Sequence, residues 1–258
     1  MYSGYNSISE IYDKINAEVD YRSWADYFEA CFDKFLNAKP ELVLDLACGT
    51  GSMTFELASR GYDMIGIDGS DAMLTRALDN AYDREISGIL FLNQDMREFE
   101  LYGTVGAITC CLDSINYLTE EKDVAKCFSL AHNYLDPDGL FLFDMNTPYK
   151  FEKIYADNSY IHEIYDEEYK INYYCGWQND YNPETNLCNF YLSVFTECED
   201  GRFSREDETQ TERCYELAQI KEMLESSGFE LLGIYGDTSF SDINENTERW
   251  HFVARAKK

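Results

Sequence analysis

The segment Leu44-Asp-Leu-Ala-Cys-Gly-Thr-Gly51 joins a run of apolar residues to a turn that contains two glycines. The apolar run, residues 42–47, predicts a buried strand, and the helical pattern that follows the turn ends at Gly61. Glycine has no Cβ, so Gly49 and Gly51 allow the backbone to approach a ligand closely. Because open α/β sheets bind ligands at the carboxyl ends of their strands, this turn is a candidate binding site.

Outward from this segment, short apolar runs alternate with amphipathic stretches of helical spacing. Each run predicts a further strand: residues 64–67, 89–92, 105–111, 140–145, 229–235 and 249–256. Strands that alternate with helices build a parallel sheet covered on both faces. Residues 5–36 predict additional helices at the N-terminal end. We therefore expect an α/β fold with a Rossmann-like, seven-stranded, mostly parallel sheet sandwiched by helices.

Residues 147–213 interrupt this alternation of strands and helices. Apolar residues recur at every second position from Tyr169 to Trp177 and from Cys188 to Val194, and Asp200-Gly201 marks a turn. This pattern predicts an antiparallel β insertion after the fifth strand. The expected organisation is a core formed by residues 1–146 and 214–258, N-terminal helices included, with residues 147–213 as a separate insertion.

The charge of the chain is strongly acidic. Its 258 residues include 21 Lys and Arg against 49 Asp and Glu, a formal net charge of −28. Such a surface repels phosphate backbones and anionic lipid, so naked nucleic acid and membrane surfaces are poor partners, although solubility alone explains an acidic surface equally well. No apolar run approaches the roughly 20 residues of a membrane helix.

The cysteines and the N-terminal residues indicate the compartment. The first residues lack the basic start and the apolar stretch of a signal peptide. Nine cysteines, an odd number without a C-x-x-C pair, favour reduced thiols over a disulfide framework. We therefore expect a cytoplasmic protein, and the absence of C-x-x-C and H-x-x-x-H spacing predicts no structural metal.

Three classes of cofactor could use the turn after the first strand. A phosphate-binding loop needs a Gly-Lys-Ser/Thr sequence, and this turn has no lysine. A dinucleotide fold needs a third glycine where this chain has Thr54. A nucleoside cofactor without phosphate remains, and Asp45 beside the turn would suit an amino group on that ligand. The alternative is a turn whose glycines are purely structural.

Two further carboxylates follow the second and third strands. Asp68, in Ile65-Gly-Ile-Asp-Gly-Ser70, could accept both hydroxyls of a ribose; its alternative role is to cap the next helix, which Ser70 does better. Asp95, in Asn93-Gln-Asp-Met96, could accept from an adenine amino group, or it could be an ordinary loop acid. Polar groups at three successive strand ends together favour a nucleoside site.

These three segments resemble the cofactor-binding motifs of the class I S-adenosylmethionine-dependent methyltransferases, and the resemblance covers the whole chain. The segments Ile11-Tyr-Asp-Lys14, Val19-Asp-Tyr-Arg-Ser-Trp-Ala-Asp-Tyr27 and Leu112-Asp-Ser-Ile-Asn-Tyr-Leu118 resemble a small bacterial group related to the sugar N,N-dimethyltransferases. The resemblance implies in-line transfer of a methyl group from S-adenosylmethionine to a small-molecule amine or hydroxyl, with S-adenosylhomocysteine as the product.

The resemblance also assigns residues to the cofactor. Asp68 would hold the ribose, and Tyr12 and Trp24 would close over the cofactor, although aromatic residues at helical spacing are also typical of a core. The cofactor-binding residues implied in this way lie on the N-terminal helices or follow the strands: Tyr12, Trp24, Ala47, Gly49, Asp68, Gly69, Met73, Asp95, Met96 and Cys111.

Two residues are candidates for the acceptor side. Asp113 would lie near the sulfonium, where it could steer a cationic substrate, accept its proton or bind the cofactor's amino group. His162 lies in the insertion, which the resemblance implies to be a substrate lid; a structural histidine is the alternative. An amine of suitable pKa can react without a protein base, whereas a hydroxyl needs one. A protein or RNA acceptor, or binding of the cofactor without turnover, are alternative functions. The acceptor, the accepting atom and the oligomeric state stay open.

Overall fold

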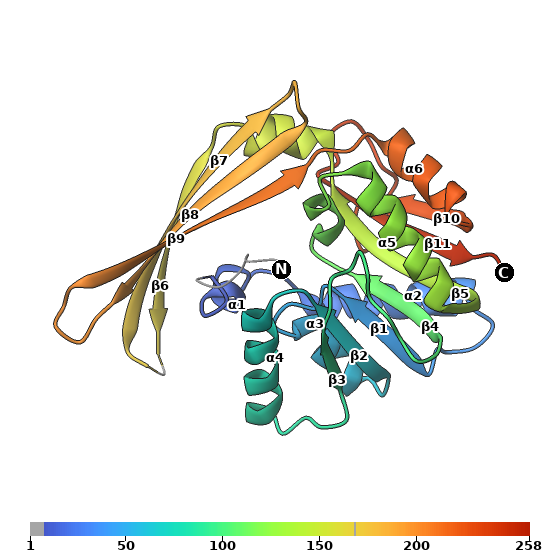
Figure 1. Cartoon of the computed structure of the whole chain (residues 1–258), viewed down its shortest axis with the longest axis horizontal. Coiled ribbons are helices and arrows are strands. Elements are labelled where there is room, and N and C mark those ends of the chain that lie inside the picture. Colours follow the sequence, from blue (N-terminus) through green and yellow to red (C-terminus); the bar gives the residue numbers. More distant parts are fainter. Residues whose placement is uncertain (1–7, 168) are drawn as a thin grey trace.

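The computed structural model describes residues 8–167 and 169–258, and it contains two separate sheets (Figure 1). The first has seven strands in the order β10-β11-β5-β4-β1-β2-β3. Its members are β1 (Leu42–Leu46), β2 (Asp63–Asp68), β3 (Leu90–Asn93), β4 (Val105–Cys110), β5 (Leu135–Asn146), β10 (Phe229–Tyr235) and β11 (Arg249–Ala256).

The connections within this sheet confirm the predicted fold class. Strands β1 to β5 pair in parallel, whereas β11 runs antiparallel to both β5 and β10. The chain proceeds from β1 to β2 and β3 on one side and then returns to place β4 on the other side of β1. This reversal opens a crevice at the carboxyl ends of β1 and β4, where open α/β sheets bind their ligands.

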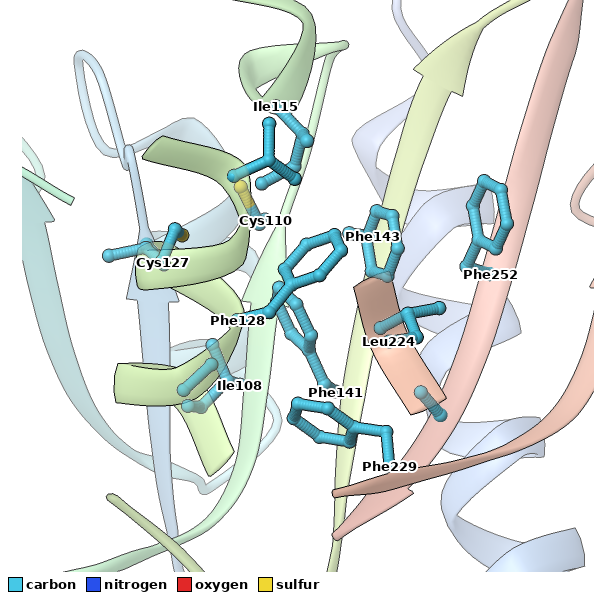
Figure 2. Packing of buried hydrophobic residues seen from close by; sticks show 14 of the residues in the cluster. Ile108, Cys110, Ile115, Cys127, Phe128, Phe141, Phe143, Leu224, Phe229 and Phe252 are labelled. Atoms are coloured by element: carbon cyan, nitrogen blue, oxygen red, sulfur yellow. The ribbon is translucent and has the colours of Figure 1, made fainter. Parts of the chain in front are cut away.

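Helices cover both faces of this sheet because its strands are apolar on both faces. The helices are α1 (Tyr12–Ile15), α2 (Tyr21–Phe35), α3 (Ser52–Ser59), α4 (Asp71–Asp83), α5 (Glu121–Tyr134) and α6 (Leu217–Ser226). In β5, Phe141 and Phe143 pack with Phe128 of α5 and Leu224 of α6 (Figure 2). The intervening Leu142 faces the opposite layer, formed by α2 and α3. This alternation is the two-residue period of a strand.

The second sheet is the predicted antiparallel insertion. Its four strands run in the order β6-β7-β8-β9, and Figure 1 shows them extending past α1. They are β6 (Ser159–Asp166), β7 (Ile171–Asn182), β8 (Leu187–Glu197) and β9 (Phe203–Arg213). One face of the sheet is apolar and packs against Ile11 and Met73, beside the carboxyl ends of the parallel strands. This contact brings the insertion next to the crevice.

Three details differ from the expectations. The residue pattern of the N-terminal helical region also indicates a short break near residues 19–21, but α1 has only four residues and the break is longer. Helix α2 begins anew with the side chain of Asp20 accepting from the Ser23 N–H at 3.1 Å; residues 5–7 lie outside the described part. Strand β5 begins at Leu135 rather than residue 140, because Asp136-Pro-Asp-Gly139, a turn sequence, forms an irregularity within the strand. A π-helical turn, η2 (Lys150–Tyr155), precedes the insertion.

The described residues include no helix that is long and apolar enough to cross a membrane. All nine cysteines are free thiols, and every one of them except Cys198 is buried. Buried thiols of this kind act as small apolar residues in the core.

Candidate active site

The turn after β1 is held open by backbone conformation. Ala47 and Gly49 have positive φ angles of 60° and 55°, and a Cβ on Gly49 would meet no atom within 4 Å. Gly51 is constrained for another reason: a Cβ there would lie 2.8 Å from the ring of Phe55. Gly49 therefore borders open space, as the approach of a ligand requires, whereas Gly51 serves the packing of α3 and not the ligand.

A cavity of about 690 Å³, open mouth included, lies beside this turn at the carboxyl ends of β1, β2 and β3. It brings together eight of the predicted cofactor residues: Tyr12, Ala47, Gly49, Asp68, Gly69, Met73, Asp95 and Met96. Leu112, also in the lining, belongs to the segment Cys111 to Asp113 that the resemblance places beside the sulfonium. The sequence analysis did not assign the other lining residues, Ser70, Ser114, Tyr117 and Leu118, to the cofactor.

Asp68 connects the turn after β1 to the start of α4. Its two carboxylate oxygens accept from the N–H groups of Gly49 and Ser70 at 2.9 and 2.8 Å. Burial raises the pKa of Asp68, against the opposing effect of these hydrogen bonds. The cap of α4 is Ser70, whose Oγ accepts from the Met73 N–H at 3.3 Å. A carboxylate oxygen accepts two hydrogen bonds, so Asp68 keeps capacity for ligand hydroxyls.

Asp95 lies on the cavity wall with an arginine that the sequence analysis missed. The guanidinium of Arg97 donates to both carboxylate oxygens, with its Nε at 2.9 and 3.1 Å, and also reaches Asp123 at 3.4 Å. The hydrogen bond from Arg97 lowers the pKa of Asp95 below its usual value. The carboxylate is therefore ionised and oriented, with Met96 beside it on the cavity wall.

The short helix α1 forms part of the cavity wall, and side-chain hydrogen bonds and an ion pair hold it in place on two sides. The hydroxyl of Thr50 donates to Asp13 at 2.5 Å, and the Asn80 amide donates to the same carboxylate at 3.3 Å. Lys14 forms an ion pair with Asp166 of β6. Tyr12, between these two residues, lines the cavity, and its pKa is raised by burial and then by neighbouring groups. Helix α1 thus joins the turn after β1 to the four-stranded sheet.

Two predicted site residues lie elsewhere. The ring of Trp24 packs 5.0 Å from the ring of His251 and 6.2 Å from that of Phe28, within the core layer between α2 and the sheet. His162 lies on β6 with its ring 6.3 Å from that of Trp177. Neither is among the residues that line the cavity. For Trp24, the geometry fits the core role that its helical spacing also predicted.

Cys111 and Asp113 follow β4 in a strained segment. Leu112 and Asp113 have φ angles of 56° and 55°, a conformation that costs energy outside glycine and is enriched at functional sites. Cys111 borders a second, smaller cavity of about 350 Å³ together with Tyr12 and Asp45. Burial raises the pKa of Asp45 to about 6 although it accepts from two threonine hydroxyls. These bonds show Asp45 in a structural role as well.

Asp113 belongs to a network of charged groups at the carboxyl ends of β4 and β5. Its carboxylate forms an ion pair with Arg249 of β11 at 2.7 Å, and its N–H donates to Asp144 of β5 at 2.8 Å. Arg249 also pairs with Asp144. Burial opposes ionisation of Asp113, but Arg249 and Lys150 outweigh it and lower the pKa. Asp113 is therefore an anion near neutral pH.

The four-stranded sheet contributes Glu212 of β9 to the same network. The Glu212 carboxyl is buried and accepts from the Asn146 amide at 3.0 Å. Burial, followed by the charge of Asp113, raises its pKa well above the usual value. The sequence analysis missed Glu212, Lys150 and Arg249 because residues so far apart along the chain leave no local pattern.

The cavity has the chemistry that S-adenosylmethionine requires. Main-chain groups of Ala47 and Gly49 border one part of it, Asp68 offers acceptors for ribose hydroxyls, and Asp95 with Met96 offers an acceptor beside an apolar surface. Among the described residues that line the cavity, the charged side chains are the two carboxylates Asp68 and Asp95.

Sequence comparison with known proteins is consistent with such a site. A family model described as a methyltransferase domain matches residues 43–139. A protein of Geobacillus sp. (strain WCH70) that carries the name methyltransferase is 32% identical over 251 residues, 97% of this chain and 99% of that protein.

Two solved structures are also similar. An S-adenosylmethionine-dependent methyltransferase from Clostridium acetobutylicum ATCC 824 is 29% identical, with a TM-score of 0.84 over 98% of this chain and 99% of its own. CalS10, an amino pentose methyltransferase from Micromonospora echinaspora solved with S-adenosylmethionine bound, shares the fold at 17% identity, with a TM-score of 0.74 over 96% of this chain and 97% of its own. The chain therefore belongs to the class I S-adenosylmethionine-dependent methyltransferases.

Proposed function

We propose that this enzyme methylates a small molecule, at an amine or a hydroxyl, in a space between the cofactor cavity and the four-stranded sheet. The main observation in support of this proposal is that the sheet packs against Ile11 and Met73, next to the cavity. The ion pair of Lys14 with Asp166 adds to this contact. An acceptor has to fit under the sheet, so residues 147–213 act as a substrate lid, and a small molecule fits better than a polymer.

Charge favours an amine as the acceptor. The net charge of −28 raises the local concentration of cations, and Asp113 is an anion beside the cavity residues Leu112 and Ser114. The name of CalS10 as an amino pentose methyltransferase is consistent with an amine, although the low identity limits that likeness to the fold.

In the proposed reaction, residues of the chain bind the cofactor, orient the acceptor and exclude water. When bound, S-adenosylmethionine supplies an electrophilic methyl group that a nucleophile displaces in line. Asp68 and Asp95 would hold its two polar parts, and Ala47 and Gly49 would contact it through the main chain. Tyr12 would exclude water, and Asp113 would hold a cationic acceptor. Positioning of this kind accounts for a large part of the rate in transfer reactions.

Calorimetry and a turnover assay test the proposal. The enzyme is titrated with S-adenosylmethionine and with S-adenosylhomocysteine, and release of S-adenosylhomocysteine is then measured with ethanolamine, glucosamine and glycine as probe acceptors. We expect micromolar binding of both cofactors and turnover with at least one amine. Turnover confined to basic proteins would contradict a small-molecule acceptor and favour a protein acceptor.

A further inference from the structure

Lys150 has a half-buried side chain whose amino group forms no hydrogen bond or ion pair with any residue the structure describes. Its Nζ lies 5.2 Å from the centre of the Tyr155 ring, the one ring contact of this group. The backbone N–H of Lys150, by contrast, donates to the hydroxyl oxygen of Thr147 at 3.2 Å. A buried or half-buried charge is normally paired, so an unpaired lysine here requires an explanation.

Lys150 does not line the cavity itself, but the turn that it begins packs beside the cavity: Phe151 belongs to the same apolar cluster as the cavity residue Met73. Lys150 opens the π-helical turn η2, which follows the carboxyl end of β5 and leads into the four-stranded sheet. Single π-helical turns are frequent at functional sites. The turn ends at Ala156, whose φ of 35° and ψ of −123° are unusual for alanine. Non-glycine residues with positive φ therefore occur both at the end of this turn and at Leu112 and Asp113.

Charged groups surround Lys150 from every neighbouring element. Arg249 of β11 is a like charge, whereas Asp113 after β4, Asp144 of β5 and Glu212 of β9 are acids. Burial and then Arg249 lower the pKa of Lys150, and the acids only partly compensate. Two buried acceptors of this region, Oδ1 of Asp144 and Oδ1 of Asn146, have no donor among the described residues. The surroundings therefore disfavour a permanent ammonium group but can stabilise one that has just gained a proton.

We propose that Lys150 is the general base of the methyl transfer, taking the proton of the acceptor amine or hydroxyl at its Nζ. The inference rests on the proposed function, because it needs an acceptor between the cavity and the lid. In the balanced step, the N–H or O–H bond of the acceptor breaks and its proton moves to uncharged Lys150. The acceptor forms a bond to the methyl carbon as the C–S bond breaks, and the electron pair stays on sulfur. Lys150 then returns the proton to solvent.

This assignment separates the roles of neighbouring residues. Asp113, whose ion pair with Arg249 keeps it ionised, is a poor proton acceptor but a good partner for the ammonium group that Lys150 becomes. Glu212 interacts with Asp113 through a side-chain hydrogen bond, and its own carboxyl accepts from the Asn146 amide, so it is a positioning residue for the Asp113 carboxylate. Lys150 is the base, and Asp113 stabilises its protonated form.

A titration that needs no acceptor tests the first requirement. The lysines of the enzyme saturated with S-adenosylhomocysteine are dimethylated with ¹³C-formaldehyde, and the Lys150→Arg variant identifies the Lys150 signal by NMR. We expect the pKa of Lys150 to lie below the ordinary value of a lysine side chain, in the direction that burial requires. A pKa at or above that ordinary value would overturn the proposal.

Kinetics test the second requirement with the amine that turns over. We expect Lys150→Met and Lys150→Arg each to lower kcat by about 100-fold or more, the usual effect of a lost general base. Cofactor binding by calorimetry should not change, and Lys153→Met, at an exposed lysine of the same turn, should keep wild-type activity. Near wild-type kcat in Lys150→Arg would overturn the assignment, because arginine keeps the charge but does not accept a proton. Loss of cofactor binding in the wild-type enzyme would instead contradict the proposed function.

Discussion

Asp68 shows how one side chain can shape a site and remain available to a ligand. It accepts from the N–H of Gly49 and the N–H of Ser70, so it fixes the turn after β1 against the start of α4. The strain in that turn, with Ala47 at a φ of 60°, persists because such bonds oppose its relaxation. A change at Asp68 therefore removes a ligand group and loosens the turn at the same time.

The Asp68→Ala variant is expected to bind S-adenosylmethionine at least about 100-fold more weakly, since two or three hydrogen bonds to a charged group are lost. Titration calorimetry measures this change. Asp71→Ala is the matched control, because Asp71 lies three residues further along, at the start of α4, but is exposed and does not line the cavity. Equal affinities of wild type and Asp68→Ala would refute the cofactor role of Asp68.

His251 gives a second prediction at this scale. Burial, followed by Arg249, lowers the pKa of His251 to about 3 from 6.5. The folded state therefore excludes a proton that the unfolded chain binds, so stability is lost as pH falls from about 6.5 toward 3, by up to about 1.4 kcal/mol per pH unit. His251→Phe should lose less stability than wild type between pH 7 and pH 5 in urea unfolding. Equal losses would show that His251 accepts a proton in the folded state.

At the scale of elements, α1 is too short to be stable alone, since helices of a single turn gain few hydrogen bonds. It is held by Asp13, which accepts from Thr50 and Asn80, and by the pair of Lys14 with Asp166. These contacts come from the turn after β1, from α4 and from β6, so α1 joins that turn to the four-stranded sheet. Its position over the cavity depends on tertiary contacts rather than on helix propensity.

We expect the double variant Asp13→Ala, Lys14→Met to release the cofactor faster and to bind it about tenfold more weakly, about 1.4 kcal/mol. Stopped-flow displacement and calorimetry measure the two quantities. Glu18→Ala serves as the control because Glu18 is exposed and beyond the end of α1. Unchanged release in the double variant would mean that α1 does not cover the bound cofactor.

At the scale of the whole molecule, the charge of −28 is the dominant electrostatic property. Ion pairs such as those of Arg60 with Asp26 and Glu29 involve only some of the carboxylates. Most of the Asp and Glu residues that the structure describes lie on the surface and form no ion pair. Self-repulsion of this kind destabilises a folded chain at low ionic strength, and salt screens it.

Raising NaCl from about 10 mM to about 150 mM should therefore raise the Tm by roughly 2–4 °C, the effect of about 1 kcal/mol in a chain of this size. Differential scanning calorimetry measures the change. A Tm that falls with salt would indicate that paired charges contribute more than the net repulsion does.

The sequence alone predicted the seven-stranded sheet, the antiparallel insertion and which residues follow the strands at one edge of the sheet. Periodicity predicted the strands and the antiparallel insertion, since burial on one or both faces leaves a local pattern. The turn at Gly49 and the acids Asp68 and Asp95 were predicted because each directly follows a strand, and parallel strands bring their carboxyl ends to one edge.

Only the tertiary structure decided which distant side chains meet. Asp113, Glu212 and Arg249 come from three different strands or their ends, and Lys150 joins them from η2. Trp24 and Tyr12 have similar helical spacing, yet one packs in the core and the other borders the cavity. The physical reason is that periodicity records only which face of an element is buried, whereas the partner on that face depends on how the sheets pack.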